Sequence, residues 1–441
     1  MKKFIETLKN IYKIEDLRSR ILYTLGIILI YRLGSNVVLP GVNPMELSEL
    51  QENASKGVLG ILNMFSGGAF ANASIFALGI MPYISASIVI QLLSIAVPYF
   101  QRLQREGESG RRRMNQITRY LTVIILIVQA PTYLTQIPDS ARVLPGVFFS
   151  LSSVIILTTG TMFVMWLGER ITEKGIGNGI SLIIMIGIIA RMPFSLIGEF
   201  TARMDKAGGG MVAFLVEMVF LFLVFVVSIL LVQGTRRIPV QYAKRIIGNK
   251  QYGGVRQYIP LKVNAAGVMP IIFAQAIMFL PLTFARYGGE TVSGFIGAFT
   301  NFTGFWYNFI FALLIIAFTY FYTAITINPQ RMAEEIRKNG GFIPGVKPGK
   351  KTVEFLDNIL SRITLPGSVF LAIVAILPAF AQLAGVTQGF AQFYGGTSLL
   401  ILVGVVLDTL QQIESHLLMR HYDGLMKSGR VKGRAGAIAS V

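Results

Sequence analysis

The sequence has 441 residues, of which 53% are hydrophobic and only 14% are charged. This composition excludes an ordinary water-soluble domain and indicates that most of the chain lies in lipid. The formal net charge is +18, from 40 Lys and Arg against 22 Asp and Glu. Because the chain contains no cysteine, disulfides and thiolate metal sites are excluded as well.

The first 20 residues form a basic amphipathic segment. Its Lys and Arg residues alternate with apolar residues at helical spacing, which is typical of a helix at a membrane surface. The segment lacks the short apolar core and the small-residue cleavage site of a secretory signal. We therefore expect the first apolar span to be retained.

Ten apolar runs are long enough to cross a hydrocarbon layer of ~30 Å at a helical rise of ~1.5 Å per residue. They predict membrane helices at 21–39, 76–97, 117–137, 147–167, 179–199, 211–232, 265–285, 305–327, 366–385 and 393–413. An even number of spans places both termini on the same side. The segments assigned to that side hold 33 Lys and Arg, and the opposite segments hold 5. Because basic loops stay inside, the sequence predicts that both termini are cytoplasmic, the tail 414–441 included.

The segment 57–74 is apolar and rich in glycine, but it is too short to cross the membrane. It reads as a half-helix that enters the membrane and turns back at Gly67 and Gly68. Such backbone is tolerated at membrane depth only inside a cavity lined by protein or water. An outer loop lying on the lipid interface remains the alternative. The next predicted helix contains Gly79 and Pro82, which we expect to weaken it.

Charged residues in the predicted spans are few. Arg32 and Arg191 lie near outer ends, Glu217 lies in the outer part of the sixth span, and Asp408 lies in the inner third of the last. Snorkelling or a local partner explains these positions better than a proton relay does. Three amides, Gln91, Gln129 and Gln275, lie in apolar spans, where they act either as glue between helices or as a polar seam between helices that can separate.

Two cytoplasmic loops, 233–264 and 328–364, are long, and each contains seven basic residues. Positive-inside bias explains basic loops in general, whereas docking of phosphates or of an acidic protein explains their length. No catalytic or nucleotide-binding constellation is present, and no metal site or cofactor is expected. The GIGNG sequence at 175–179 is predicted to be a tight turn in which Asn178 caps the fifth span.

Seven stretches together closely resemble the SecY family, the central subunit of the bacterial secretion translocon. They are ASIFALGIMPYISASIVIQLL (73–93), EGESGRRRMNQITRY (106–120), ITEKGIGNGIS (171–181), RRIPVQYAKR (236–245), IPLKVN (259–264), GGFIPGVKPG (340–349) and YGGTSLLI (394–401). The resemblance extends over nearly the whole chain.

The resemblance implies an all-α integral membrane fold, with ten helices in two pseudo-symmetric halves, 21–205 and 206–413, around an hourglass pore. The segment 57–74 would be a re-entrant plug, whose residues include Leu62, Phe65, Gly67, Gly68, Phe70 and Ser74. The glycine-rich segment 207–211 would lie in the loop that joins the halves. A ring of aliphatic side chains closes the waist in the family, and the matching residues here are Ile84, Ile88, Ile184, Ile188, Ile272 and Ile401.

The resemblance also implies a lateral gate towards lipid, on whose helices Gln91, Gln129 and Gln275 lie. The two basic loops match the docking surface for the SecA ATPase and the ribosome. That surface would include Arg236, Arg237, Lys244, Arg245, Lys347 and Lys350, with a possible contact to ribosomal RNA. Lys347 replaces the arginine usual in the family, which keeps the charge but loses the planar fork.

The leading function hypothesis is therefore a passive protein-conducting channel in the inner membrane. It would take signal-peptide-bearing preproteins, work with SecE, SecG, SecA or ribosomes, and release apolar segments into membrane lipids. A small-solute secondary transporter is the alternative, and an intramembrane enzyme is a third hypothesis.

Overall fold

The structure is a computed structural model of the whole chain, and it describes residues 14–53, 57–143, 146–205, 209–242, 245–247, 250–252, 256–285 and 303–427. The chain divides into two compact units. Unit 1 contains residues 1–54, 62–191 and 405–441, and unit 2 contains residues 55–61 and 192–404. Three of the boundaries between them fall within α4, α9 and α17, and the fourth lies between residues 54 and 55.

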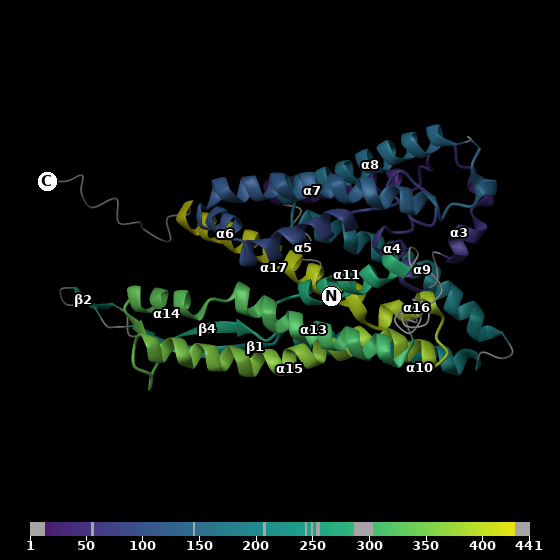
Figure 1. Cartoon of the computed structure of the whole chain (residues 1–441). Coiled ribbons are helices and arrows are strands. Elements are labelled where there is room, and N and C mark those ends of the chain that lie inside the picture. Colours follow the sequence, from purple (N-terminus) through teal and green to yellow (C-terminus); the bar gives the residue numbers. More distant parts are fainter. Residues whose placement is uncertain are drawn as a thin grey trace. The chain divides into compact units, whose positions relative to one another are not determined.

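Helices account for most of the described chain (Figure 1). In chain order, the elements up to residue 204 are α2 (Glu15–Gly34), η1 (Pro44–Glu46), α3 (Ser48–Asn53), α4 (Gly57–Phe65), α5 (Met81–Ala96), α6 (Pro98–Arg105), α7 (Glu108–Leu134), η2 (Asp139–Ala141), α8 (Val147–Lys174) and α9 (Gly179–Met204). The later elements are α10 (Gly210–Gln233), β1 (Thr235–Tyr242), β2 (Arg245–Ile247), β3 (Lys250–Tyr252), β4 (Arg256–Lys262), α11 (Met269–Ala285), α13 (Phe305–Thr326), α14 (Pro329–Lys338), β5 (Gly341–Phe342), α15 (Lys350–Leu383), α16 (Gln388–Ala391), η3 (Gln392–Tyr394) and α17 (Gly396–Lys427).

A helix lies at each of the ten positions where the sequence predicts a span. Within the described residues, seven helices are long and apolar enough to cross a membrane, and eight if the bent pair α5 and α6 counts as one span. The other two predicted spans correspond to α2, which has charged residues in its first turns, and to α11, which has 17 residues. The chain is therefore a multi-pass membrane protein.

The second predicted span begins later than the sequence suggests. Helix α5 starts at Met81, whereas residues 76–80 form turns in which Gly79 has a φ of 55°. Pro82 consequently lies in the first turn of the helix, where its missing N–H costs no hydrogen bond. The expectation that Gly79 and Pro82 weaken the interior of this helix is wrong, because both residues define its start.

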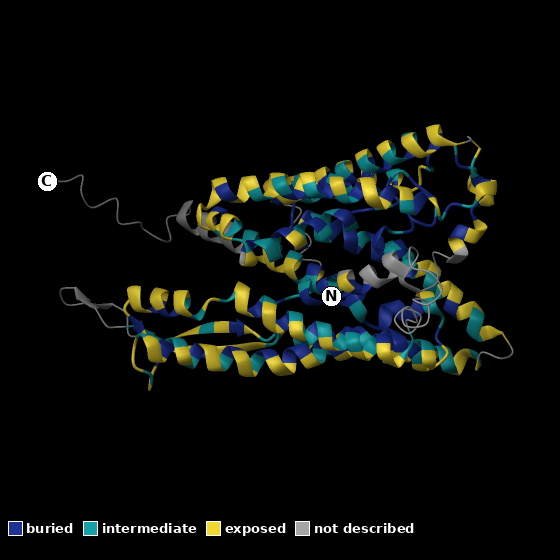
Figure 2. Cartoon of the chain, in the orientation of Figure 1, coloured by how far each residue is buried: buried dark blue, intermediate teal, exposed yellow. Residues whose placement is uncertain are grey.

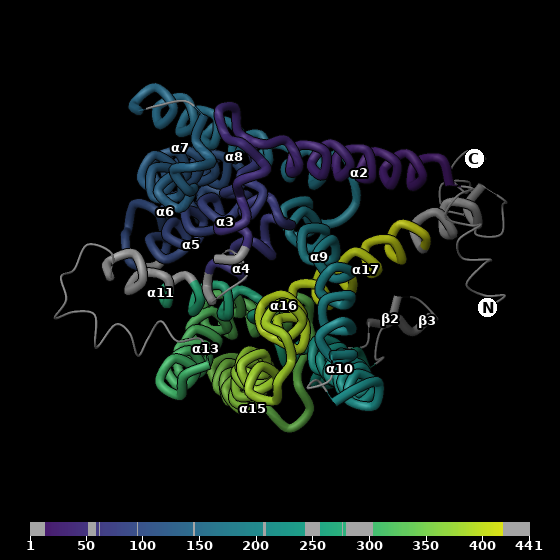
Figure 3. The backbone as a smooth tube through the Cα atoms, turned by 90° about the vertical axis from the view of Figure 1, so that its right-hand side faces the viewer, coloured from purple at the N-terminus to yellow at the C-terminus, as the bar shows by residue number. Residues whose placement is uncertain are grey.

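Helices α5, α7 and α8 pack in sequence in unit 1, and α2 packs against α8 (Figure 3). Small residues permit this close packing. A Cβ on Gly34 would lie 2.1 Å from the ring of Phe76, and a Cβ on Gly160 would lie 2.2 Å from the carbonyl oxygen of Ile75. The ring of Phe76 also stacks on Tyr31, with centroids 6.1 Å apart. The segment that precedes α5 is therefore held between α2 and α8.

The described part of unit 2 contains a small sheet that the all-helical expectation does not include. Strands β4, β1 and β5 are adjacent in that order and antiparallel, and Ile238 of β1 pairs with Ile259 of β4. Ile238, Val240 and Leu261 are buried against α14 and α15, which lie along the sheet in Figure 1. Alternating burial along β1 carries the strand signal, but the clustered arginines and Pro239 obscure it in the sequence.

Helix α15 is also longer than its predicted span. It begins at Lys350 in the second basic loop and continues past Pro366 to Leu383. Leu356 and Leu360 near its start pack in the core under the sheet, so this part of the loop is an ordered helix.

Exposed residues run along much of the described helices (Figure 2), and many of them are large apolar residues. On α10, Leu215, Val219 and Phe222 are all more than half exposed. Surfaces of this kind are stable only in contact with lipid or another apolar chain.

Candidate functional site

The segment that follows α4 makes a compact turn in the described part of unit 1. Helix α4 ends at Phe65, and Gly67 and Gly68 have φ values of 65° and 94°, a conformation that favours glycine. The chain then returns to the end of α2, where the N–H of Ile75 donates to the carbonyl of Val37 over 2.9 Å. The segment therefore turns back at the two glycines, where the sequence predicts the turn.

Polar side chains within the turn satisfy its buried backbone. The side-chain oxygen of Asn63 accepts from the N–H of Ala71 over 3.1 Å, and the Ser66 hydroxyl accepts from the N–H of Phe70 over 3.1 Å. Both side chains are buried, as are those of Phe65, Phe70 and Ser74, whereas Leu62 is half-buried. Internal bonding of this kind allows non-helical backbone to persist away from water.

Two tyrosines tie the turn to neighbouring helices. The hydroxyl of Tyr31 on α2 donates to the Ser66 carbonyl over 3.3 Å, and that of Tyr133 on α7 donates to the Phe70 carbonyl over 2.8 Å. The rings of Tyr133 and Phe70 also meet edge to face at 4.8 Å. These hydroxyls bond carbonyls of one short segment that contains no charged residue.

The turn also meets α9 at a second glycine. A Cβ built on Gly67 would lie 2.9 Å from the Cα of Gly187, so only glycine permits this approach. Gly187 lies between Ile184 and Ile188, two of the six residues that match the family's ring. Both isoleucines are buried, with exposed fractions of 4% and 0%.

The remaining residues of that set divide between the two units. On α5, Ile88 is buried and Ile84 is half-buried, and their spacing of four residues places them on one helix face. Ile272 on α11 is half-buried and Ile401 on α17 is buried, and both lie in unit 2.

The three amides have different environments. Gln91 on α5 is half-buried and donates to the Ser87 hydroxyl of its own helix over 3.4 Å. Gln129 on α7 is exposed, and Gln275 on α11 is buried with 4% exposure. Gln91 and Gln129 lie on helices of unit 1 that pack together, and Gln275 lies in unit 2.

The basic residues of the two loops 233–264 and 328–364 lie on and next to the sheet. Arg236 and Arg237 are exposed on β1, and Lys347 and Lys350 are exposed around the start of α15. The backbone turns sharply just before each of these lysines, since Gly345 and Gly349 have φ values of 84° and 102°. Arg245 begins strand β2, although its side chain is not described, and Lys244 lies outside the described residues, as does the tail 435–441.

The predicted turn at 175–179 is confirmed; it connects α8 with α9 and bonds side chains of α2 and α17. The side-chain oxygen of Asn178 accepts from the N–H groups of Ile180 and Ser181, which is an N-cap. The N–H of Gly177 donates to the side chain of Gln412 over 2.9 Å, and the N–H of Ile176 donates to the Thr24 hydroxyl over 3.2 Å.

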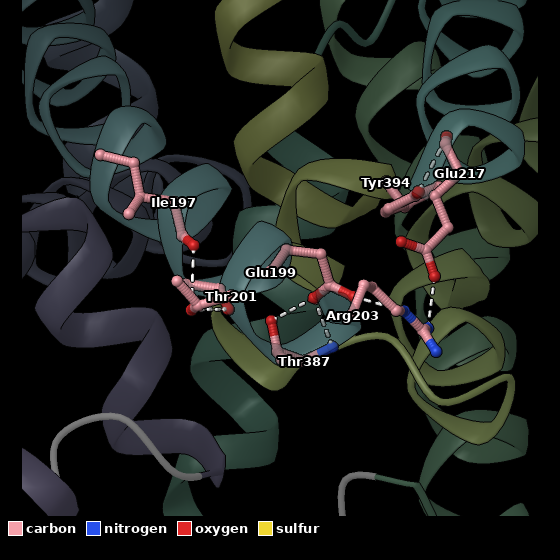
Figure 4. A network of polar contacts seen from close by, with 8 residues as sticks. Ile197, Glu199, Thr201, Arg203, Glu217, Thr387 and Tyr394 are labelled. Carbon is pink, nitrogen blue, oxygen red and sulfur yellow. Dashed lines mark hydrogen bonds and ion pairs between the residues drawn. The ribbon is translucent and has the colours of Figure 1, made fainter. Parts of the chain in front are cut away.

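Unit 2 contains an ionic network that sequence reasoning identifies only in part (Figure 4). Arg203 on α9 bonds both Glu199, over 3.0 Å, and Glu217 of α10. Glu199 is fully buried and also accepts from the N–H and hydroxyl of Thr387. Glu217 therefore has the local partner that its position suggests. Glu199 stands at the predicted end of its span, so the sequence does not indicate that it is buried.

Among the described residues, no group of three or more His, Asp or Glu could hold a metal ion. What the described side chains offer is apolar surface, backbone-directed hydroxyls and exposed positive charge.

A family model described as SecY matches residues 74–410. The protein translocase subunit SecY of Mycobacterium tuberculosis is 42% identical over 450 aligned residues, which cover 96% of this chain and 99% of that protein. The subunit of the same name from Halalkalibacterium halodurans is 44% identical over 437 residues, covering 96% and 99% of the two chains. Both relatives are protein translocase subunits, and neither supports the small-solute transporter hypothesis.

Solved structures agree on the fold. A channel described in a study of the plug domain of the SecY protein superposes with a TM-score of 0.60 at 16% identity, over 96% of this chain and 95% of that one. Sec61 in the canine ribosome-channel complex gives 0.55 at 15% identity with the same coverage. With relatives above 40% identity along almost its whole length and a family model over most of it, the chain belongs to the SecY family.

Proposed function

We propose that this chain is the pore-forming subunit through which unfolded preproteins cross the inner membrane, with both of its termini in the cytoplasm. Members of the SecY family are protein-conducting channels, and this chain is one of them. The proposal concerns how its own residues seal, open and dock.

The observation that carries the proposal is the position of the turn after α4, which packs against α9. In unit 1 it lies directly against Gly187 of α9, beside Ile184 and Ile188. The hydroxyls of Tyr31 and Tyr133 donate to backbone carbonyls of this segment. Because the segment has no charged side chain, its departure would leave no ion pair broken. We assign residues 57–74 as the plug that covers the constriction at rest.

The six isoleucines, Ile84, Ile88, Ile184, Ile188, Ile272 and Ile401, form the constriction in this proposal. A ring of aliphatic side chains excludes water and ions when it is empty, because dewetting gates a narrow apolar pore. Such side chains also offer a passing polypeptide no polar group to bind. The ring thus seals without retaining its substrate.

Sideways release of apolar segments is assigned to the helices that carry Gln91, Gln129 and Gln275. At the centre of a bilayer each Leu or Ile favours insertion by ~0.3–0.6 kcal/mol, whereas a charged residue opposes it by ~2.5–3.5 kcal/mol. A segment exposed to lipid through a lateral opening is therefore sorted by its composition.

The energy for translocation comes from a partner. Arg236, Arg237, Lys244, Arg245, Lys347 and Lys350 would form the docking surface for a SecA-type ATPase or for a ribosome, including its RNA, whose charge is complementary. SecE and SecG are the proposed companion subunits. Co-purification from the native membrane in mild detergent tests this assembly.

Deletion of residues 62–74 tests the central assignment. Reconstituted vesicles that contain the deletion variant should leak ions at rest, whereas a deletion of the same length at the C-terminal end, residues 429–441, should not. Unchanged leakage in the first variant would refute the plug assignment. Saturable uptake of a small solute coupled to an ion gradient would instead indicate a transporter.

A further inference from the structure

The turn at Gly67 and Gly68, called the plug turn below, is flanked by two arginines of unit 1. Each arginine contacts one of the two glycines. Arg32 lies in the last turn of α2, and its Nη1 donates to the Gly67 carbonyl over 3.0 Å. A Cβ built on Gly67 would lie 2.7 Å from the same nitrogen. The guanidinium group thus holds the turn by a charge-assisted bond to its backbone.

Arg191 covers the second glycine. A Cβ built on Gly68 would lie 2.9, 3.0 and 3.0 Å from the Nε, Cζ and Nη2 atoms of Arg191. Because three atoms of the guanidinium group are equally distant from that point, the flat face of the group lies against Gly68. Any side chain at this position would displace it.

Neither arginine has an ion pair with a described residue. The two groups are close enough for the charge of Arg32 to repel that of Arg191. Each is half-buried, so water screens this repulsion only in part. The Gly67 carbonyl compensates the charge of Arg32 by accepting its hydrogen bond, and the guanidinium group of Arg191 lies against the backbone at Gly68.

Arg191 also occupies a defined place on α9. It follows Ile184 by seven residues and Ile188 by three, so the three side chains lie along one face of the helix. The arginine therefore stands about one turn beyond the ring residues of the same helix. The plug turn contacts this face at both Gly187 and Arg191.

We infer that Arg32 and Arg191 form a latch that holds the plug in its resting position. This inference rests on the proposed function, since it assigns these residues a role in gating the same pathway. At rest the two positive charges face the plug backbone. Once the plug leaves, they face each other without that compensation, so their charge favours the closed state.

The test compares resting ion conductance in planar bilayers that contain the full chain, reconstituted with its companion subunits. Arg32→Met and Arg191→Met keep an apolar stem of similar length and remove the charge. Each should raise the open fraction about tenfold, which corresponds to about 1.4 kcal/mol. Arg32→Lys and Arg191→Lys keep the charge and should restore most of the seal.

Arg142→Met is the matched control. Arg142 also lies in unit 1 and donates to two carbonyls, those of Leu134 and Ile137, each over 2.8 Å, and neither carbonyl belongs to the plug. Its variant should conduct like the wild type at rest. Equal leakage from this variant would indicate a general loss of packing and would overturn the latch.

The plug deletion separates this inference from the proposed function. In a chain that lacks residues 62–74, Arg32→Met and Arg191→Met should add nothing to the leakage. The latch is refuted, and the plug assignment remains, if each substitution raises the resting conductance by the same factor with and without residues 62–74. The same conclusion follows if the deletion raises the conductance and neither substitution does. If the deletion itself does not leak, the proposed function fails.

Discussion

Gly67 and Gly187 meet in unit 1 without a side chain between them, because a Cβ on Gly67 would approach the Cα of Gly187 to 2.9 Å. A Cβ on Gly187 would in turn lie 2.8 Å from the carbonyl oxygen of Phe65. Both approaches are too short for real atoms. The resting position of the proposed plug therefore depends on glycine at position 187 of α9, where there is room for backbone but not for a side chain.

The first prediction follows from that contact. Gly187→Ala should displace the plug and raise resting conductance, because its methyl group has no space. Gly198→Ala on the same helix meets nothing within 4 Å and, by helix propensity, should stabilise α9 by up to ~1 kcal/mol. Equal conductance of the two variants in planar bilayers would contradict this account.

A second prediction uses the absence of cysteine from the chain. A Cβ on Gly79 would lie 3.5 Å from that of Ser66, a separation suited to a disulfide. In the pair Ser66→Cys and Gly79→Cys, oxidation should fix the turn and slow preprotein translocation, and reduction should restore it. The strain of a side chain at the positive φ of Gly79 is present in both states. The two single variants control for the oxidant, and an equal rate in the fully cross-linked protein would show that the turn need not move.

The third prediction concerns Arg203. Arg203→Ala leaves Glu199 and Glu217 without their shared cation, and removing one partner of a buried ion pair costs ~3–5 kcal/mol. The free energy of unfolding in detergent should fall by this amount. The value for Arg203→Lys should lie between those of the wild type and Arg203→Ala. Arg331→Ala serves as the control, because the pair of Arg331 with Glu335 is exposed and such pairs contribute ~0–1 kcal/mol. Equal losses for Arg203→Ala and Arg331→Ala would show that burial of the network has no energetic effect.

The fourth prediction concerns docking. Reversing Arg236, Arg237 and Lys350 to Glu should abolish translocation stimulated by the SecA-type ATPase, because the surface would repel an acidic partner. Reversal of three other exposed arginines, Arg111, Arg112 and Arg113, changes the net charge equally and should retain activity. Loss of activity in both triple variants would mean that total charge, and not this surface, matters.

Local features of the chain could be predicted from sequence because their causes are local. A helix appears at each long apolar run, Asn178 caps α9, and the turn at Gly67 and Gly68 lies where two adjacent glycines permit positive φ. The sequence motifs also indicated the family. The sequence-based predictions were wrong where contacts between distant residues determine the local structure. The sheet depends on the core that it shares with α14 and α15, and the start of α5 depends on the contacts of Phe76.

A multi-pass helical membrane protein can be recognised from the amino-acid sequence, since hydrophobic length and charge asymmetry act segment by segment. The contacts of Arg32, Arg191 and Arg203 emerge only from the folded chain. Spacing along the chain does not show that Arg32 reaches Gly67, that Arg191 covers Gly68, or that Thr387 completes the site of Glu199. Those contacts join residues far apart in sequence, and packing alone brings them within bonding distance.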